Sequence, residues 1–238
     1  MKIFAVDTSA RSASVAIVEE GAIKGEYFIN TMLTHSETLM PMTELLFKST
    51  KCELKDIDVF AVNDGPGSFT GLRIGIAAVK GMAYAVGKPC VGISALESMA
   101  YNFSDTDSII CAVMDARCSQ VYNALFEVEN NNVSRLCQDR ALSISELTEE
   151  LLKLNRKVML VGDGAQLCYS AMKDTLENVS LAPQNLRFQR ASSTALVAIK
   201  AVNDGKTVSA SSLMPKYLRL PQAQRELLAK QNKEKINN

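Results

Sequence analysis

FAVDTSARSASVAIVEE, residues 4–20, returns in pattern as CAVMDARCSQVYNALFE, residues 111–127. Both stretches predict an apolar strand that ends in aspartate, a short turn with arginine and serine, and a second apolar strand that ends in an acidic residue. Two such strand pairs in one chain predict a duplicated α/β fold. The polar, turn-rich stretch NFSDTDS, residues 102–108, predicts the seam between the copies.

The first predicted helix follows the first copy. Thr34 and Glu37 have the spacing of a capping box, which places the start of a helix at this point, and the helix is expected to run to about Phe47. Pro41 lies inside it and removes one backbone hydrogen bond, so a kink or an early stop is expected there.

A second, longer helix is predicted over residues 69–86, after a strand at 58–64. Its only charges, Arg73 and Lys80, lie seven residues apart on one side, so a sheet, another helix or another protein must cover the rest. Strands and helices continue to alternate in the second half, with strands at 132–138 and 157–163 and helices at 144–154 and 192–204.

The bulk composition excludes several classes of protein. With 238 residues and 47% apolar content, the chain is expected to form one or two soluble, well-buried domains. Its 26 basic and 26 acidic residues give no net charge that would attract nucleic acid or a membrane surface. No apolar run approaches the roughly 18 residues of a membrane span, and MKIFAV at the start is too short for a signal peptide, so we predict a cytoplasmic protein.

Histidine and cysteine usage argues against a metal site. His35 is the single histidine in the chain, so no metal site that needs two histidines can be built from this chain alone. The six cysteines are scattered without a C-x-x-C pair, which argues against zinc and against a disulfide framework. We therefore predict no metal.

The glycine-rich stretch GPGSFTGLRIG, residues 65–75, is the first candidate binding loop. Thr70 stands where a dinucleotide fingerprint needs glycine, and no lysine follows Gly71 as a P-loop would require. The loop nevertheless lies between a strand and a helix N-terminus, where backbone amides favour an anion. Two interpretations stay open: an anion site, or a turn that Ser68 caps and that lets another backbone approach closely.

The stretch Asp7-Thr8-Ser9 is a second candidate, because actin-like ATPases and sugar kinases hold nucleotide phosphate at such a place. An Asx-turn between two strands is the alternative. A third short motif, Gly162-Asp163-Gly164, fits either a nucleotide contact or a plain turn. The candidate residues for weak ATP or ADP binding, with no cofactor required, are Asp7, Thr8, Ser9, Gly65 and Gly67.

Several motifs together closely resemble one family over nearly the whole chain. GPGSFTGLRIG occurs with DTS near the N-terminus, HSETLMP, MDARCSQVYNALFE and PKYLR. This combination resembles the TsaB (YeaZ-type) family of tRNA threonylcarbamoyladenosine biosynthesis proteins. The resemblance implies the duplicated α/β fold of actin, Hsp70 and sugar kinases (ASKHA), with two mixed-sheet subdomains that we place at residues 1–103 and 104–238, the second with a polar tail beyond Pro221.

The resemblance also implies a role without catalysis. The related catalytic subunit TsaD holds a metal with an H-x-x-x-H pair while it transfers a threonylcarbamoyl group to N6 of adenosine 37 of tRNA. Aligned on Glu97, the equivalent positions in this chain are Ala95 and Met99. The chain is therefore expected not to be an enzyme.

The partners implied by the resemblance are TsaD, bound through the N-terminal helices, and the ATPase TsaE, with tRNA reached only through the complex. A homodimer is expected when the chain is alone. The candidate interface residues are His35, Leu39, Met42, Leu45, Leu46, Phe69, Leu72, Arg73, Ile76, Val79 and Lys80.

Two rival functions are weaker. A stand-alone ATP-binding phosphotransferase of the sugar-kinase type needs a second D-x-G-T loop, and the second half opens instead with Met114-Asp115-Ala116-Arg117. A peptidase relay would need His35 and a serine facing one another, but Ser36 is its neighbour on one helical turn, where side chains diverge by about 100°.

Overall fold

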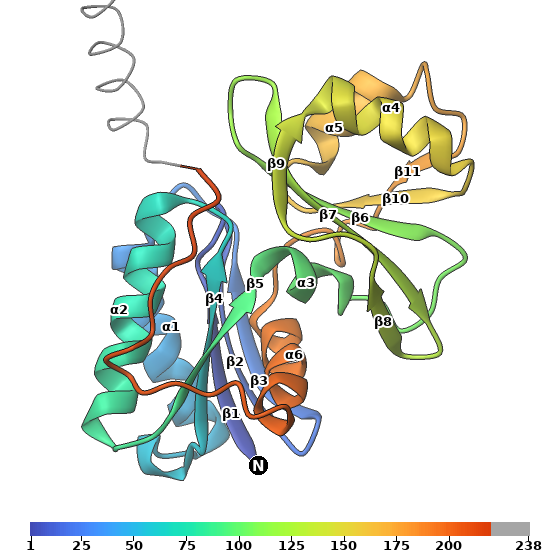
Figure 1. The fold of residues 1–238 in the computed structure, drawn as a ribbon. Helices are drawn as coiled ribbons and strands as arrows, with labels where there is room; N and C mark the ends of the chain where they lie inside the picture. Colours follow the sequence, from blue (N-terminus) through green and yellow to red (C-terminus); the bar gives the residue numbers. More distant parts are fainter. Residues whose placement is uncertain (220–238) are drawn as a thin grey trace, which may run out of the picture.

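A computed structural model describes residues 1–219, which form two α/β halves, each built on a mixed β-sheet (Figure 1). The first sheet has the strand order β3-β2-β1-β4-β5. Its strands β1 to β3 are antiparallel neighbours, whereas β4 and β5 continue from β1 in parallel. The bounds are β1 Lys2–Asp7, β2 Ala13–Glu19, β3 Ala22–Ile29, β4 Val59–Gly65 and β5 Cys90–Ser94.

The second sheet repeats this pattern in the order β11-β10-β6-β7-β8, with β9 also paired to β7. Strands β6 and β7 are antiparallel, as β1 and β2 are, and β10 is parallel to β6 as β4 is to β1. The duplication predicted from the sequence is therefore confirmed. The bounds are β6 Ile109–Asp115, β7 Gln120–Glu129, β8 Asn132–Arg135, β9 Arg140–Ser143, β10 Val158–Val161 and β11 Val179–Leu181.

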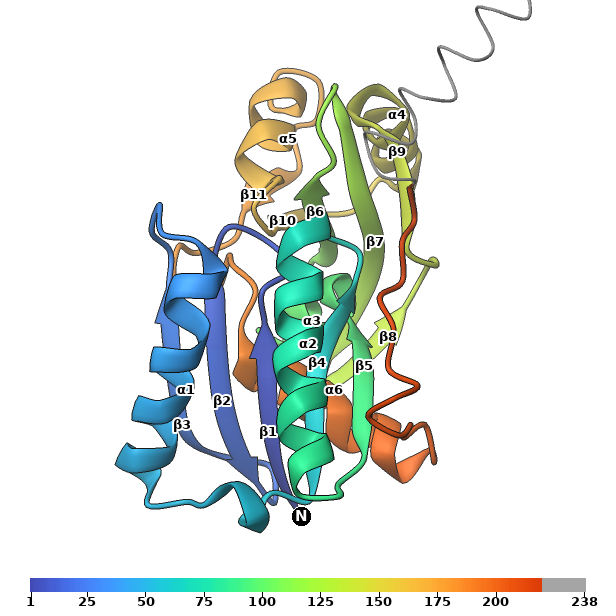
Figure 2. The same ribbon diagram turned by 90° about the vertical axis from the view of Figure 1, so that its left-hand side faces the viewer.

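Two helices cover one face of the first sheet, α1 His35–Thr50 and α2 Phe69–Ala85 (Figure 2). The capping box is present, because Glu37 Oε2 accepts a hydrogen bond from Thr34 N at 2.9 Å. Helix α1 continues through Pro41 to Thr50, three residues beyond the predicted end. Leu39 and Leu46, on either side of the proline, are buried in the core, and their packing compensates for the lost backbone bond.

Helix α6, Ala191–Asn203, covers the opposite face of the first sheet (Figure 1). Its N-terminus is held by Glu26 of β3, which accepts hydrogen bonds from Ser192 N at 3.0 Å and from Arg190 Nε at 3.1 Å. The assignment of residues 104–238 to a second subdomain is therefore wrong for this helix. Covered on both faces, β1 and β4 are buried along nearly their whole length, and each contains a continuous apolar run, at residues 3–6 and 59–62.

The second sheet is also covered on both faces. Helices α4, Ile144–Leu154, and α5, Ala165–Met172, pack on one side, and the short helix α3, Ala95–Ala100, packs on the other. Helix α4 was predicted, whereas α5 and the 3-10 turn at Leu54–Asp56 were not.

The chain returns to the first half at its C-terminal end. We call residues 206–219 the strap. It begins beside β5, where Val208 and Cys90 form an isolated β-bridge, and runs along α2. The polar tail predicted beyond Pro221 lies outside the described residues. Within residues 1–219, every helix is too short or too polar to cross a membrane.

Candidate functional site

A cleft of about 1020 Å³ lies between the two halves. Both halves line it, as does the end of the strap. Its first wall contains Ser9–Arg11, Thr31–Ser36, Pro66–Gly71 and Ile74; its second contains Met114–Arg117, Tyr122 and Asp163; and the strap adds Lys216–Arg219.

On the first wall, the two candidate phosphate loops are packed against each other. Ser68 N donates a hydrogen bond to the Ser9 carbonyl at 2.6 Å, and Thr8 Oγ1 donates to the Gly71 carbonyl at 2.8 Å. These contacts join the turn after β1 to the loop that precedes α2. The Ser68 amide, which would otherwise be available to an anion, is thereby used within the protein.

The glycines of this loop permit that approach. A Cβ atom on Gly67 would lie 2.3 Å from the Ser9 carbonyl oxygen, and one on Gly71 would lie 2.1 Å from the Thr8 carbonyl oxygen. Both distances are far below a van der Waals contact, so only glycine fits. Of the two interpretations left open by the sequence, the structure favours close approach of another backbone, with Ser68 Oγ accepting from Gly71 N at 3.3 Å as a helix cap.

Asp7 ends β1 beneath this contact and is 1% exposed. Its Oδ1 accepts from Ser9 N at 2.8 Å and from Ser9 Oγ at 2.7 Å, and its Oδ2 accepts from Asn63. Burial raises the pKa of the Asp7 carboxyl above its ordinary value, against these hydrogen bonds. Of the five candidate nucleotide-binding residues, Ser9 and Gly67 line the cleft, whereas Asp7, Thr8 and Gly65 lie behind it.

On the second wall, Asp163 faces the cleft after β10 and is held by Gln189, whose Nε2 donates to Asp163 Oδ1 at 3.1 Å. Burial raises the pKa of Asp163 to about 6. Asp115, at the end of β6, is exposed and accepts a hydrogen bond from Arg117 N at 2.7 Å. The sequence left two interpretations of the motif around Asp163 open, a nucleotide contact across the cleft and a plain turn, and Asp163 lies in the cleft wall.

Asp64 and Lys216 form an ion pair that sequence reasoning missed. The two side chains approach to 2.9 Å, with Asp64 only 3% exposed, and Lys216 N also donates to the Asp64 carbonyl at 2.7 Å. Burial raises the pKa of Asp64 to about 6, and the Lys216 ammonium opposes this rise. The two residues are far apart in the sequence, so no local pattern could have paired them.

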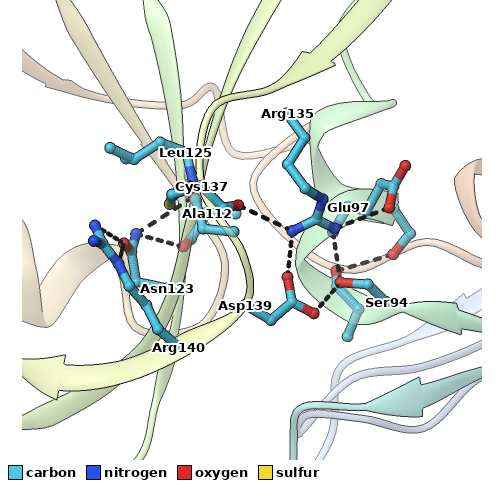
Figure 3. A network of polar contacts seen from close by, with 12 residues as sticks. Ser94, Glu97, Ala112, Asn123, Leu125, Arg135, Cys137, Asp139 and Arg140 are labelled. Carbon is cyan, nitrogen blue, oxygen red and sulfur yellow. Dashed lines mark hydrogen bonds and ion pairs between the residues drawn. The ribbon is translucent and has the colours of Figure 1, made fainter.

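A network of ion pairs lies around Arg135, beside helix α3 (Figure 3). Arg135 lies between Glu97 of α3, at 2.9 Å, and Asp139, at 2.5 Å. Asp139 in turn accepts a hydrogen bond from Ser94 Oγ at 2.6 Å, which joins the end of β5 to the second half. Nearby, the buried Asn123 accepts a hydrogen bond from Arg140 at 3.0 Å.

Ala95 and Met99, on the same short helix as Glu97, are fully buried in the apolar cluster beneath the second sheet. Within residues 1–219, no three His, Cys, Asp or Glu side chains come together as a metal ion would require. The single histidine, His35, donates from Nε2 to the Ala10 carbonyl at 2.7 Å and so helps to hold the turn after β1.

The structure separates the candidate interface residues into two groups. Six are buried, and five of these, all but Leu72, belong to the core cluster under the first sheet. They are therefore not available to a partner, and their assignment to an interface is corrected: Leu39, Met42, Leu46, Leu72, Ile76 and Val79. The physical reason is that α1 and α2 bury their apolar stripes against β1, β2 and β4. The other five retain exposed surface: His35, Leu45, Phe69, Arg73 and Lys80.

Comparison with known proteins gives consistent matches. The family described as TsaD, tRNA N6-adenosine threonylcarbamoyltransferase, matches residues 30–227. The tRNA threonylcarbamoyladenosine biosynthesis proteins TsaB of Bacillus subtilis (strain 168) and of Escherichia coli (strain K12) are each 28% identical over 234 residues, which cover 97% of this chain and 100% of theirs. The solved structure of YeaZ from Pseudomonas aeruginosa superposes with a TM-score of 0.75 at 25% identity, over 91% of this chain and 99% of that one.

The duplicated two-sheet architecture, with a cleft between its halves, is that of the actin, Hsp70 and sugar-kinase class. The chain belongs to the TsaD family within this class, as a TsaB (YeaZ-type) member.

Proposed function

We propose that this chain is a non-catalytic subunit required for the formation of N6-threonylcarbamoyladenosine in tRNA. In this role it binds and activates the catalytic subunit TsaD together with the ATPase TsaE. It reaches tRNA only through the complex, works in the cytoplasm and requires no cofactor of its own.

The observation that carries the proposal lies in helix α3. The positions that the resemblance equates with the metal-binding histidines of TsaD hold Ala95 and Met99, and both side chains are fully buried among apolar neighbours. Neither offers an imidazole nitrogen to a metal ion. Glu97, between them, is used in the ion pair with Arg135. Because helix α3 lacks both metal-binding histidines, this chain would support a reaction that another subunit carries out.

A surface for the partner is available on the outer side of α1 and α2. Met40 and Leu45 on α1 are 50% and 49% exposed, and Tyr84 on α2 is 81% exposed. The helices α1 and α2 lie next to each other on this side of the molecule (Figure 2). Apolar side chains on neighbouring helices suit helix-on-helix packing, and the adaptable Met40 suits a partner surface. In the absence of TsaD, we expect the same face to pair two copies of this chain.

An omission test addresses the function directly. Threonylcarbamoyl transfer to tRNA is reconstituted from TsaD, TsaE and the adenylate-forming enzyme, with and without this chain. We expect product only when this chain and TsaD are both present. Equal product without this chain would contradict a required subunit, and product without TsaD would contradict a non-catalytic one.

A matched pair of substitutions tests the interface. Leu45→Asp and Leu152→Asp alter leucines that are 49% and 47% exposed, on α1 and α4 respectively. Because both side chains are half exposed, both variants should fold. We expect Leu45→Asp to abolish co-elution with TsaD on gel filtration and Leu152→Asp to retain it. Equal binding by the two variants would exclude the outer side of α1 as the interface.

One alternative function is favoured by a specific observation, the cleft of about 1020 Å³ between the halves. A stand-alone ATP-binding phosphotransferase would use such a cleft. ATP turnover by the isolated chain would support this alternative and would argue against the accessory role.

A further inference from the structure

The strap makes its first contacts along the length of α2. Lys80 Nζ donates to the carbonyl oxygens of Ser211 and Leu213, at 3.1 Å and 3.2 Å. Leu213 itself is 2% exposed and belongs to the core cluster under α2. The strap is therefore bound to the helix by a buried apolar anchor and by the ammonium group beside it.

At the N-terminal end of α2, the strap ends in an aromatic stack. The Tyr217 ring lies on the Phe69 ring with centroids 4.3 Å apart. The Arg73 guanidinium lies 3.9 Å from the Phe69 centroid, and Arg73 Nε donates to the Tyr217 hydroxyl at 3.0 Å. Stacking and cation–π contacts of this kind stabilise the contact beyond the apolar area they bury.

Next to the stack, Lys216 pairs with the buried Asp64. The ion pair uses Asp64 Oδ2, and the other carboxylate oxygen, Oδ1, has no hydrogen-bond partner among the described residues. If Lys216 moved away, a buried carboxylate would lose its cation, which is costly in an apolar environment. The raised pKa of Asp64 reflects the same burial. The ion pair between Lys216 and the buried Asp64 therefore holds this end of the strap in place.

The last contact crosses the cleft. Arg219 NH1 donates to the carbonyl oxygen of Ala116 at 2.8 Å, and Ala116 directly follows β6 of the second half. Figure 1 shows the strap rising along α2 toward the second half. The strap thus binds α2, the end of β4 and the second wall of the cleft in succession.

We propose that the strap is a latch that holds the cleft at its present width, and that a partner docking on α2 releases it. Three accessible side chains of α2, Phe69, Arg73 and Lys80, are occupied by the strap. A partner that engages them takes them from the strap, so partner binding and strap release are linked. Release would free Arg219 from Ala116 and let the halves separate. The release step rests on the proposed function, whereas the latch rests on the contacts of this chain alone.

Hydrogen exchange of the isolated full chain, followed by mass spectrometry, tests the latch. We expect Lys216→Ala and Tyr217→Ala to raise exchange about tenfold in the strap and at residues 114–119 on the opposite wall, because each removes a local closing contact. Exchange at residues 144–154 of α4 should not change, which separates latch opening from general unfolding. Lys206→Ala is the matched control, since Lys206 lies in the strap and its ammonium group pairs with Asp204, at 3.0 Å, rather than with α2 or the second half. Unchanged exchange at residues 114–119 in both variants would overturn the latch.

Adding TsaD to the unmodified chain tests release. The expected result is slower exchange in α1 and α2 together with faster exchange in the strap. Slower exchange in the strap would overturn release and would make the strap part of the interface. If TsaD protects neither helix, the proposed function fails and partner release falls with it, while the latch is decided by the variants.

Discussion

The turn after β1 and the turn after β6 begin from the same sequence pattern and end in different surroundings. In the first half, Asp7 is 1% exposed and its turn lies on the glycine loop before α2. In the second half, Asp115 is exposed, and the three residues after Ala116 all have left-handed backbone conformations, with φ of 63°, 54° and 56° at Arg117, Cys118 and Ser119. The repeated pattern specifies a strand pair and does not specify what covers its turn.

The difference comes from the strand beside each pair. In the first half, β4 leads into the glycine loop, which reaches under the turn. In the second half, β10 leads into Gly162, where a Cβ would lie 2.0 Å from the Val113 carbonyl oxygen. That close approach is to the end of β6 itself, before the turn, so Asp115 stays open to the cleft and Asp163 lines it as well.

The largest effect is expected from Gly71→Ala in the first half. The new Cβ would lie 2.1 Å from the Thr8 carbonyl oxygen, so the turn and α2 must separate. We expect a loss of about 4 kcal/mol in the free energy of unfolding, measured by urea denaturation. Gly81→Ala is the control in the same helix, because nothing lies within 4 Å of its Cβ; it should stabilise the protein by about 0.5–1 kcal/mol. Equal effects would contradict the close approach.

The two aspartates that end the repeated strands can be compared directly. Asp7→Ala leaves Ser9 N and the Asn63 amide without their buried acceptor, and should cost about 3 kcal/mol. Asp115→Ala removes an exposed acceptor and should cost about 0.5 kcal/mol or less. Similar losses in urea unfolding would show that the second turn is as closely packed as the first.

The raised pKa of Asp163, in the second half, should make the free energy of unfolding depend on pH. Because its pKa is raised to about 6 in the folded protein from 3.8, its contribution to stability is fully present below about pH 4 and is lost as the pH rises through 6. The shift corresponds to at most about 3 kcal/mol, and solvent in the cleft reduces this to about 2 kcal/mol. Asp163→Asn should therefore gain about 2 kcal/mol relative to the unmodified chain between pH 4 and pH 7.5, measured by urea unfolding. A difference in unfolding free energy that does not change with pH would contradict a raised pKa at Asp163.

The smallest effect is expected at Ser119, which has a positive φ in the second turn. Ser119→Gly relieves the left-handed strain and should stabilise the protein by about 0.5 kcal/mol. Ser9→Gly in the first turn should destabilise it instead, since Ser9 Oγ donates to Asp7 Oδ1 at 2.7 Å. Thermal unfolding of the two variants measures the two changes in stability. Changes of the same sign would contradict the predicted difference between the turns.

Much of the fold could be predicted because its signals are local. The capping box at Thr34 and Glu37, the apolar strands and the long helix after the glycine loop each depend on neighbours in the sequence. Helix α6 was predicted as a helix but placed in the wrong half, because its partner Glu26 lies on β3 and sequence order gives no sign of that contact.

The candidate site was predicted less completely. The glycine loop and Asp7-Thr8-Ser9 were identified, but their contact with each other was not, because it depends on how β1 and β4 are paired. The six buried interface candidates illustrate the same limit: apolar periodicity identifies a covered face but not whether a sheet or a partner covers it.

The sequence by itself determined the duplicated strand pairs, the capped helices and the absence of a histidine pair, since these follow from residue identity and short-range spacing. Only the tertiary structure decided that the glycine loop holds a neighbouring turn, that Lys216 neutralises Asp64, and that the strap crosses the cleft to Ala116. Each of these contacts joins segments far apart in the chain. Their free energy depends on burial and on distances of a few ångströms, which exist only after the two sheets have formed.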